Sequence, residues 1–183
     1  MKDFNLKLAT ENDSHIVKNC INNMYGIKYE TRDNKKIAEA IKDKTEIYVL
    51  AYKNNDCVGF SGASVNNDYY KDIISPDIAV IDYIYVDKRY RNISLSYELI
   101  STLLKSLVKI GTKQAIMQVQ TYNSQRFFHY ALSDKNIIKS STIEVKGKIY
   151  EDQILFIEDL EKVSTITPRE LILKTHNYKL EEK

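Results

Sequence analysis

A strand, a short basic loop and a helix follow one another in residues 81–100, and this arrangement can bind phosphate. The first six residues are β-branched or aromatic apart from one aspartate, a pattern typical of a largely buried strand. The loop at residues 87–92 is basic and polar, and the helix after it begins with unpaired backbone N–H groups. These groups and the helix dipole attract anions. We therefore expect a phosphate site at the junction, with an ordinary α/β structural unit as the alternative.

Asp82 is a second candidate for chemistry, because it places a carboxylate inside an otherwise apolar strand. Such a group is costly to bury unless it is paired or lines a cavity. A carboxylate that lines a cavity can act as a general base, directly or through a water molecule. The alternative is an internal partner for a lysine or a tyrosine, and the sequence does not choose between the two.

Hydrophobic periodicity predicts the elements that would position these residues. Leucines recur every fourth residue from Leu95 to Leu107 and predict one apolar helix face, with Gly111 as a stop signal. Further strands are expected at residues 4–9, 46–53, 57–65, 115–120, 137–145 and 149–157. Further helices are expected to begin near residues 10–13, 33–34 and 123–124. The predicted order is β-α-α-β-β-β-α-β-α-β-β, an α/β (α+β) domain over residues 1–160, followed by a charged tail, 161–183, that can add an edge element.

Composition limits the classes of function. The chain has 183 residues, of which 43% are hydrophobic and 28% charged, as expected for one globular domain. A net charge of +2 with interleaved acids and bases argues against nucleic acid as the main partner. The sequence has no apolar run suited to a signal peptide or a membrane span, so a cytoplasmic location is expected. Two distant cysteines and scattered histidines predict buried thiols and no metal site.

Two motifs give the chain a resemblance to a known family. Residues Arg91-Asn92-Ile93-Ser94-Leu95-Ser96 resemble the central (Arg/Gln)-x-x-Gly-x-(Gly/Ala) motif of GNAT-type N-acetyltransferases, with serine at both small positions. Asn123 and Tyr130 match a second motif of that family, in which Arg126 stands where a small residue is usual. The predicted order of elements is also that of the GNAT fold. The resemblance therefore implies a mixed, mostly antiparallel sheet of six to seven strands with flanking helices.

The resemblance also implies acetyl-CoA as the cofactor and a role for each matching residue. The backbone N–H groups of residues 92–96 would bind the pyrophosphate, with helix capping as the alternative for the two serines. The fourth and fifth strands would splay apart, and pantetheine would bind the exposed backbone of Ile84, Tyr85 and Val86. Asn123 would hold the same arm from the other side, with a plain N-cap as its alternative. Tyr130 would protonate the departing thiolate, or else be a buried aromatic. Asp82, chosen for its place in an apolar strand, is the candidate base that would accept the proton of the amine.

The sequence thus predicts an acetyl-CoA-dependent N-acetyltransferase that acts on a primary amine of a small molecule or peptide. The alternative is a catalytically inactive GNAT-fold module that binds CoA or a partner, because both small positions of the motif hold serine. No residue pattern names the acceptor amine. A homodimer through an edge strand or the tail is a further expectation, and no nucleic-acid or membrane partner is expected.

Overall fold

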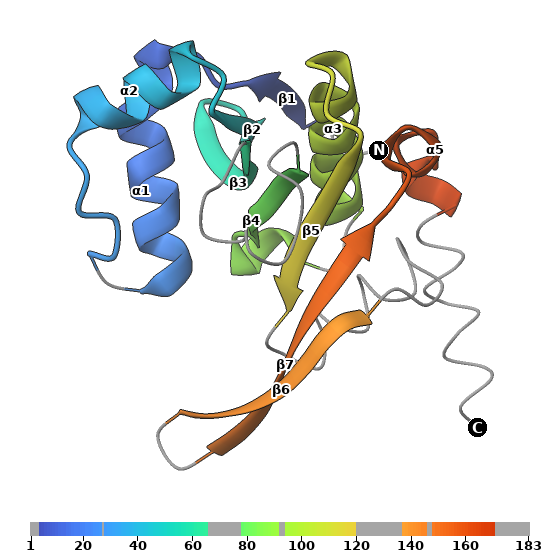
Figure 1. The fold of residues 1–183 in the computed structure, drawn as a ribbon. Helices are drawn as coiled ribbons and strands as arrows, with labels where there is room; N and C mark the ends of the chain where they lie inside the picture. Colours follow the sequence, from blue (N-terminus) through green and yellow to red (C-terminus); the bar gives the residue numbers. More distant parts are fainter. Residues whose placement is uncertain are drawn as a thin grey trace.

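The computed structural model describes residues 4–26, 28–65, 78–91, 94–119, 137–145 and 148–170. Its elements follow in the expected order (Figure 1). The strands are β1 (Asn5–Leu8), β2 (Glu46–Lys53), β3 (Asp56–Val65), β4 (Ile78–Val86), β5 (Gln114–Val119), β6 (Ile137–Val145) and β7 (Lys148–Ile157). The helices are α1 (Ser14–Tyr25), α2 (Asn34–Lys42), α3 (Leu95–Lys109) and α5 (Leu160–Ser164), with short 3-10 turns η1 (Glu11–Asp13) and η3 (Lys88–Tyr90). The helix expected to begin near residues 123–124 lies outside the described residues. None of the helices described here is long and apolar enough to cross a membrane.

The strands form one sheet in the order β1-β2-β3-β4-β5-β7-β6. Neighbouring strands are antiparallel except for β4 and β5, which run parallel. A parallel pair requires a crossover connection, and α3 forms it. The expected mixed, mostly antiparallel sheet is therefore confirmed.

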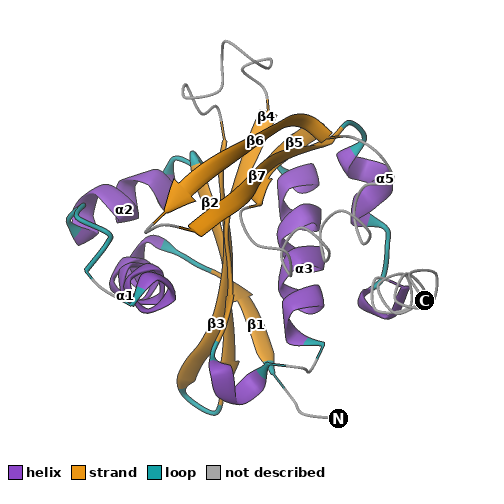
Figure 2. Cartoon of the chain, turned by 90° about the horizontal axis from the view of Figure 1, so that it is seen from below, coloured by secondary structure: helices purple, strands orange, loops and turns teal. Residues whose placement is uncertain are grey.

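Helices cover both faces of this sheet. Figure 2 shows α1 and α2 on one side and α3 and α5 on the other. The leucine stripe of α3 is fully buried against the sheet, as its spacing predicted. Each of these side chains contributes roughly 1.5–3 kcal/mol by leaving water. On the opposite face Ile21 and Ile37 pack with Tyr48 and Phe60.

The first residues after position 160 pack against the domain. Leu160 is fully buried in the cluster formed by α3, and Val163 and Ile166 contact the same cluster. Asp159 caps α5, because its side chain accepts a hydrogen bond from the N–H of Lys162. The beginning of the charged tail thus adds a short helix beside α3.

A glycine allows an aromatic ring to lie directly on β3. A Cβ atom at Gly62 would lie 2.5 Å from Cδ1 of Tyr48, closer than any real contact. The Tyr48 ring therefore rests on the backbone of β3, and its centroid lies 6.2 Å from that of Tyr83 on β4. This aromatic layer faces α1 and α2.

Candidate active site

Asp82 forms a β-bulge in the middle of β4. Adjacent residues of β3, Gly62 and Ala63, pair with Tyr83 and Ile81, so Asp82 has no partner in the ladder. A bulge bends the strand and redirects a side chain. Ile81 packs into the α3 core, whereas Tyr83 packs on the α1 face. Alternation from Ala79 and Ile81, which pack in the α3 core, already places Asp82 on the opposite face, and the extra residue brings Tyr83 to that same face.

The bulge coincides with the point at which β4 and β5 separate. Their parallel pairing runs from Ile78 and Gln114 to Ile81 and Met117. Both strands continue beyond it, β4 to Val86 and β5 to residue 119, without further pairing to each other. Figure 1 shows the C-terminal ends of both strands at the same end of the molecule as the C-terminal end of α1.

The alternation of an antiparallel ladder decides which backbone groups of β4 face this opening. The N–H of Asp87 donates to the carbonyl of Val58 on β3 at 2.9 Å, and the register is regular from there back to Tyr83. Tyr85 therefore directs its backbone groups at β3, while Ile84 and Val86 direct theirs at the side that β5 has left. Of the three residues expected at the splay, two present their backbone to it.

Arg91 lies beside this open edge. Its Nε donates to the carbonyl of Val86 at 2.9 Å, and its guanidinium carbon lies 5.9 Å from the centroid of the Tyr85 ring. The rest of the side chain is exposed. The cation is therefore held next to the splay while its remaining N–H groups stay accessible.

The start of α3 does not use its serine as a cap. Ser94 precedes the helix, and its hydroxyl donates to Oε1 of Glu98 at 2.8 Å rather than accepting from the helix. Leu95 is fully buried, and Ser96 is half-buried. The N–H groups of Tyr97 and Glu98 donate to the carbonyl of Ser94 at 3.0 and 3.1 Å, so the first-turn amides that helix geometry leaves for an anion are those of Leu95 and Ser96. Four expected site residues lie outside the described residues: Asn92, Ile93, Asn123 and Tyr130.

Solvent reaches the side chain of Asp82, although the protein around it removes part of its hydration. Its side chain is exposed to solvent, yet enough protein surrounds it that desolvation raises its pKa to about 6. Ser64 opposes this rise, since its N–H and hydroxyl donate to Oδ2 at 3.1 and 2.8 Å. The partner is thus a serine rather than the lysine or tyrosine considered from the sequence. Both bonds go to Oδ2, which leaves Oδ1 to receive a proton.

A network around Arg32, which the sequence does not indicate, borders this carboxylate. Arg32 binds both oxygens of Glu30, with Nε–Oε1 and NH2–Oε2 distances of 2.9 and 2.7 Å, and its NH1 lies 2.6 Å from Oε1 of Glu46. Tyr48 donates to the other oxygen of Glu46 at 2.9 Å. Arg32 lowers the pKa of Glu30, whereas burial raises that of Tyr48. The pairing joins residues 14 positions apart, so no local pattern could have revealed it.

The comparison with protein families completes this picture. Residues 15–131 match the acetyltransferase (GNAT) family, and that match covers more than half of the chain. The chain belongs to the GNAT acetyltransferase family. The resemblance inferred from the two motifs is therefore confirmed, and so is the GNAT fold.

Solved structures with this fold resemble the chain in structure, although their sequence identity to it is low. The yncA protein of Salmonella typhimurium, solved with its cofactor acetyl-CoA, is 13% identical, with a TM-score of 0.64 over 85% of this chain and 94% of that one. A GNAT acetyltransferase of Streptococcus pneumoniae is 15% identical, with a TM-score of 0.65 over 84% and 98% of the two chains. NAA60 of Arabidopsis thaliana with acetyl-CoA is 14% identical, with a TM-score of 0.61 over 84% and 97%. No curated protein sequence matches the chain.

Proposed function

We propose that this GNAT protein transfers the acetyl group of acetyl-CoA to a primary amine of a small molecule or peptide. One observation carries the proposal: the bulge at Asp82 places an accessible carboxylate where β4 separates from β5. A proton acceptor and an open strand edge are thereby adjacent, as acyl transfer to an ammonium group requires. The neighbours solved with acetyl-CoA support the identity of the donor.

The residues of this chain fit the coenzyme. The backbone groups of Ile84 and Val86 face the open edge and can pair with the amides of a pantetheine arm as an added strand does. The first-turn amides of α3, among them those of Leu95 and Ser96, can bind the pyrophosphate. Arg91 is held at the Val86 end of the open edge, where its charge can attract the pyrophosphate.

Catalysis then depends on two proton transfers by side chains of the chain. Acetyl-CoA supplies a thioester, whose carbonyl carbon the amine attacks with loss of the thiolate. Asp82 first accepts a proton from the ammonium group at Oδ1 or through a water molecule, which frees the nitrogen lone pair. Tyr130 donates the proton that the departing thiolate requires and regains one as the nitrogen, cationic after its attack, loses its second proton. Asn123 holds the pantetheine arm. With a pKa of about 6, Asp82 is mostly ionised at neutral pH and ready for this role.

The direct test is acetyl transfer with the purified chain. We expect free thiol to appear, and a matching N-acetyl product by mass spectrometry, when acetyl-CoA is mixed with a panel of primary amines and peptides. Asp82→Asn should slow the reaction, while Glu39→Gln on the exposed face of α2 should not. Absence of product with every amine, although CoA binds, would refute the enzymatic proposal.

One observation favours a second candidate, a non-catalytic module. Glu98 places a carboxylate in the first turn of α3, bound to Ser94, where it opposes a phosphate group. A module that binds no coenzyme would show no thermal stabilisation by CoA, whereas a coenzyme-binding protein is stabilised by any ligand that prefers the folded state. A CoA titration followed by melting temperature separates the two.

A further inference from the structure

Tyr25 and Tyr29 form an exposed aromatic surface at the end of α1. Their rings are stacked, with centroids 4.1 Å apart and planes inclined by 29°. They are 44% and 53% exposed, and in the described part of the chain Leu8 is the other large hydrophobic side chain that is exposed. Single exposed apolar residues are common, but two rings in contact make a continuous surface.

Ion pairs and hydrogen bonds hold this surface in place. The segment that carries Tyr29 is tied to α1, because the N–H of Glu30 donates to Oδ1 of Asn22 at 2.8 Å and Lys18 donates to the carbonyl of Arg32 at 2.5 Å. The pair between Arg32 and Glu46 ties the same segment to β2. An exposed ring on a segment fixed in this way is preorganised, so a ligand would lose little entropy in ordering it.

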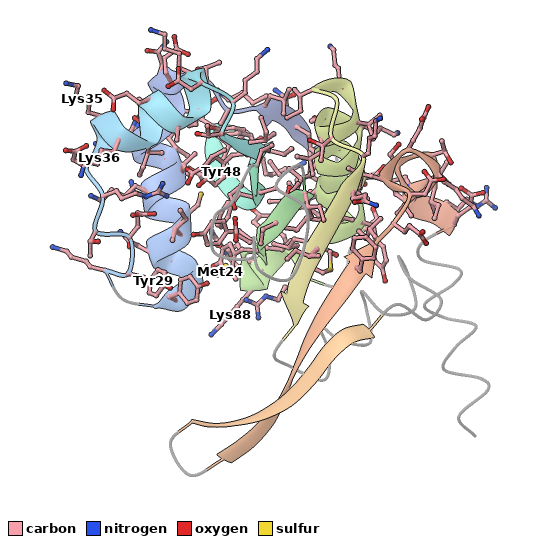
Figure 3. All side chains as sticks on the ribbon, viewed as in Figure 1. Met24, Tyr29, Lys35, Lys36, Tyr48 and Lys88 are labelled. Carbon is pink, nitrogen blue, oxygen red and sulfur yellow. The ribbon has the colours of Figure 1, made fainter. Side chains whose placement is uncertain are left out.

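The surface lies beside the candidate base. Figure 3 places Met24 and Tyr29 at the end of α1, and Met24 packs in one cluster with Tyr83 of β4. Tyr25 is close enough to Asp82 for the negative charge of that carboxylate to contribute to the raised pKa of Tyr25, after burial and Tyr29. A molecule whose amine reaches Asp82 therefore has the stacked rings within reach.

The charges around Asp82 limit what such a molecule carries. Both oxygens of Glu30 bind Arg32, and those of Glu46 bind Arg32 and Tyr48. Within the described network these carboxylates are committed to the protein, so Asp82 is the one that faces an acceptor. Among the described residues the site thus offers one uncommitted carboxylate and an aromatic wall, which favours a single ammonium group over a diamine.

From these observations we infer that the acceptor is a primary monoamine with an aromatic body, which stacks on Tyr25 and Tyr29 while its nitrogen meets Asp82. This inference rests on the proposed function, since it names the substrate class of the same site. The two tyrosines are then acceptor-binding residues, and they determine specificity through ring contact rather than through their hydroxyl groups.

Binding of tryptamine tests the inference without turnover. The chain has no tryptophan, so the fluorescence of the indole amine can be excited selectively and its anisotropy followed in the presence of CoA. We expect Tyr29→Ala to weaken binding roughly threefold to tenfold, the scale of one aromatic contact. Tyr29→Phe, which keeps the ring, and Leu8→Ala, an equally exposed residue on β1, should bind as the wild type does. Equal affinity of Tyr29→Ala and wild type would overturn the inference.

A matched amine panel separates this inference from the proposed function. Tryptamine and 2-phenylethylamine should be acetylated with a higher kcat/KM than hexylamine or putrescine, and Tyr29→Ala should remove that preference mainly through KM. Acetylation of all four amines at equal efficiency refutes the aromatic acceptor and leaves the transferase standing. Ring-dependent binding with no acetylation refutes the transferase and supports aromatic recognition.

Discussion

Replacement of Asp82 by asparagine should lower turnover and alter its pH dependence. Asparagine has the same shape and can still accept from Ser64, so the change removes the proton-accepting capacity and little else. A general base typically contributes a factor of 10² to 10⁴, and we expect kcat to fall by about 10². The affinity for CoA should stay within about twofold, because Asp82 lies outside the strand edge and helix start that would bind it.

The pKa of the carboxyl group sets the shape of the profile. With a pKa of about 6, Asp82 is about nine-tenths ionised at pH 7 and about one-tenth ionised at pH 5. The kcat of the wild type should therefore rise with pH through an inflection near pH 6 and then level off. Asp82→Asn should lack this inflection. A wild-type profile that is flat between pH 5 and 8, or a variant that keeps full kcat, would refute the role of Asp82 as base.

The free energy of unfolding supplies an independent check on Asp82, because its ionisation should raise turnover but lower stability. The folded pKa of Asp82 lies above its unfolded value of 3.8, so the unfolded chain loses its proton first as pH rises. The carboxyl therefore reduces the free energy of unfolding progressively between pH 3.8 and about 6. At pH 8 the asparagine variant should melt at a higher temperature than the wild type, and at pH 4 the two should melt together. Its loss of activity could then not be ascribed to unfolding.

Three further predictions concern the surroundings of the site. Arg32→Met leaves the buried Glu30 unpaired and should lower the free energy of unfolding by about 2 kcal/mol in urea titrations. The control Lys35→Met, at an exposed residue, should change it by less than about 0.5 kcal/mol. Equal effects of the two changes would contradict the network around Arg32. The Sγ atoms of Cys20 and Cys57 lie 3.5 Å apart, so diamide should take two electrons and two protons from them and form one intramolecular disulfide. The disulfide would be detected as the loss of both thiols in protein that stays monomeric. Two thiols that persist after treatment would count against this proximity. Tyr130→Phe should lower kcat while CoA affinity stays nearly unchanged, and an unaltered kcat would remove Tyr130 from the role of acid.

The sequence predicted the elements well because each carries a local signal. The spacing of the leucines in α3 determines its buried face, and Asp33 was expected near the start of α2, where its side chain accepts from the N–H of Lys36 at 2.8 Å. The β6–β7 hairpin also begins and ends within one residue of its expected strands.

The site was less accessible to prediction, because much of it depends on contacts between distant residues. Asp82 was found from its type alone, a carboxylate in an apolar strand, but its bulge depends on the register with β3. The two cysteines looked unrelated at 37 positions apart and meet only because α1 packs on β3. Tyr25 and Tyr29 are four residues apart, yet α1 ends at Tyr25, so helical spacing could not predict their stacking.

The single extra residue in β4 connects the two halves of the proposed chemistry. Asp82 lies on the face opposite the α3 core by alternation from Ala79 and Ile81, and the extra residue places Tyr83 on that same face. The strand also bends at this point, where its pairing to β5 ends. The bend exposes the backbone of Ile84 and Val86, groups that do not depend on side-chain identity. The open edge is therefore set by the backbone of β4, so serine in place of glycine at positions 94 and 96 leaves that half of the proposed coenzyme site intact.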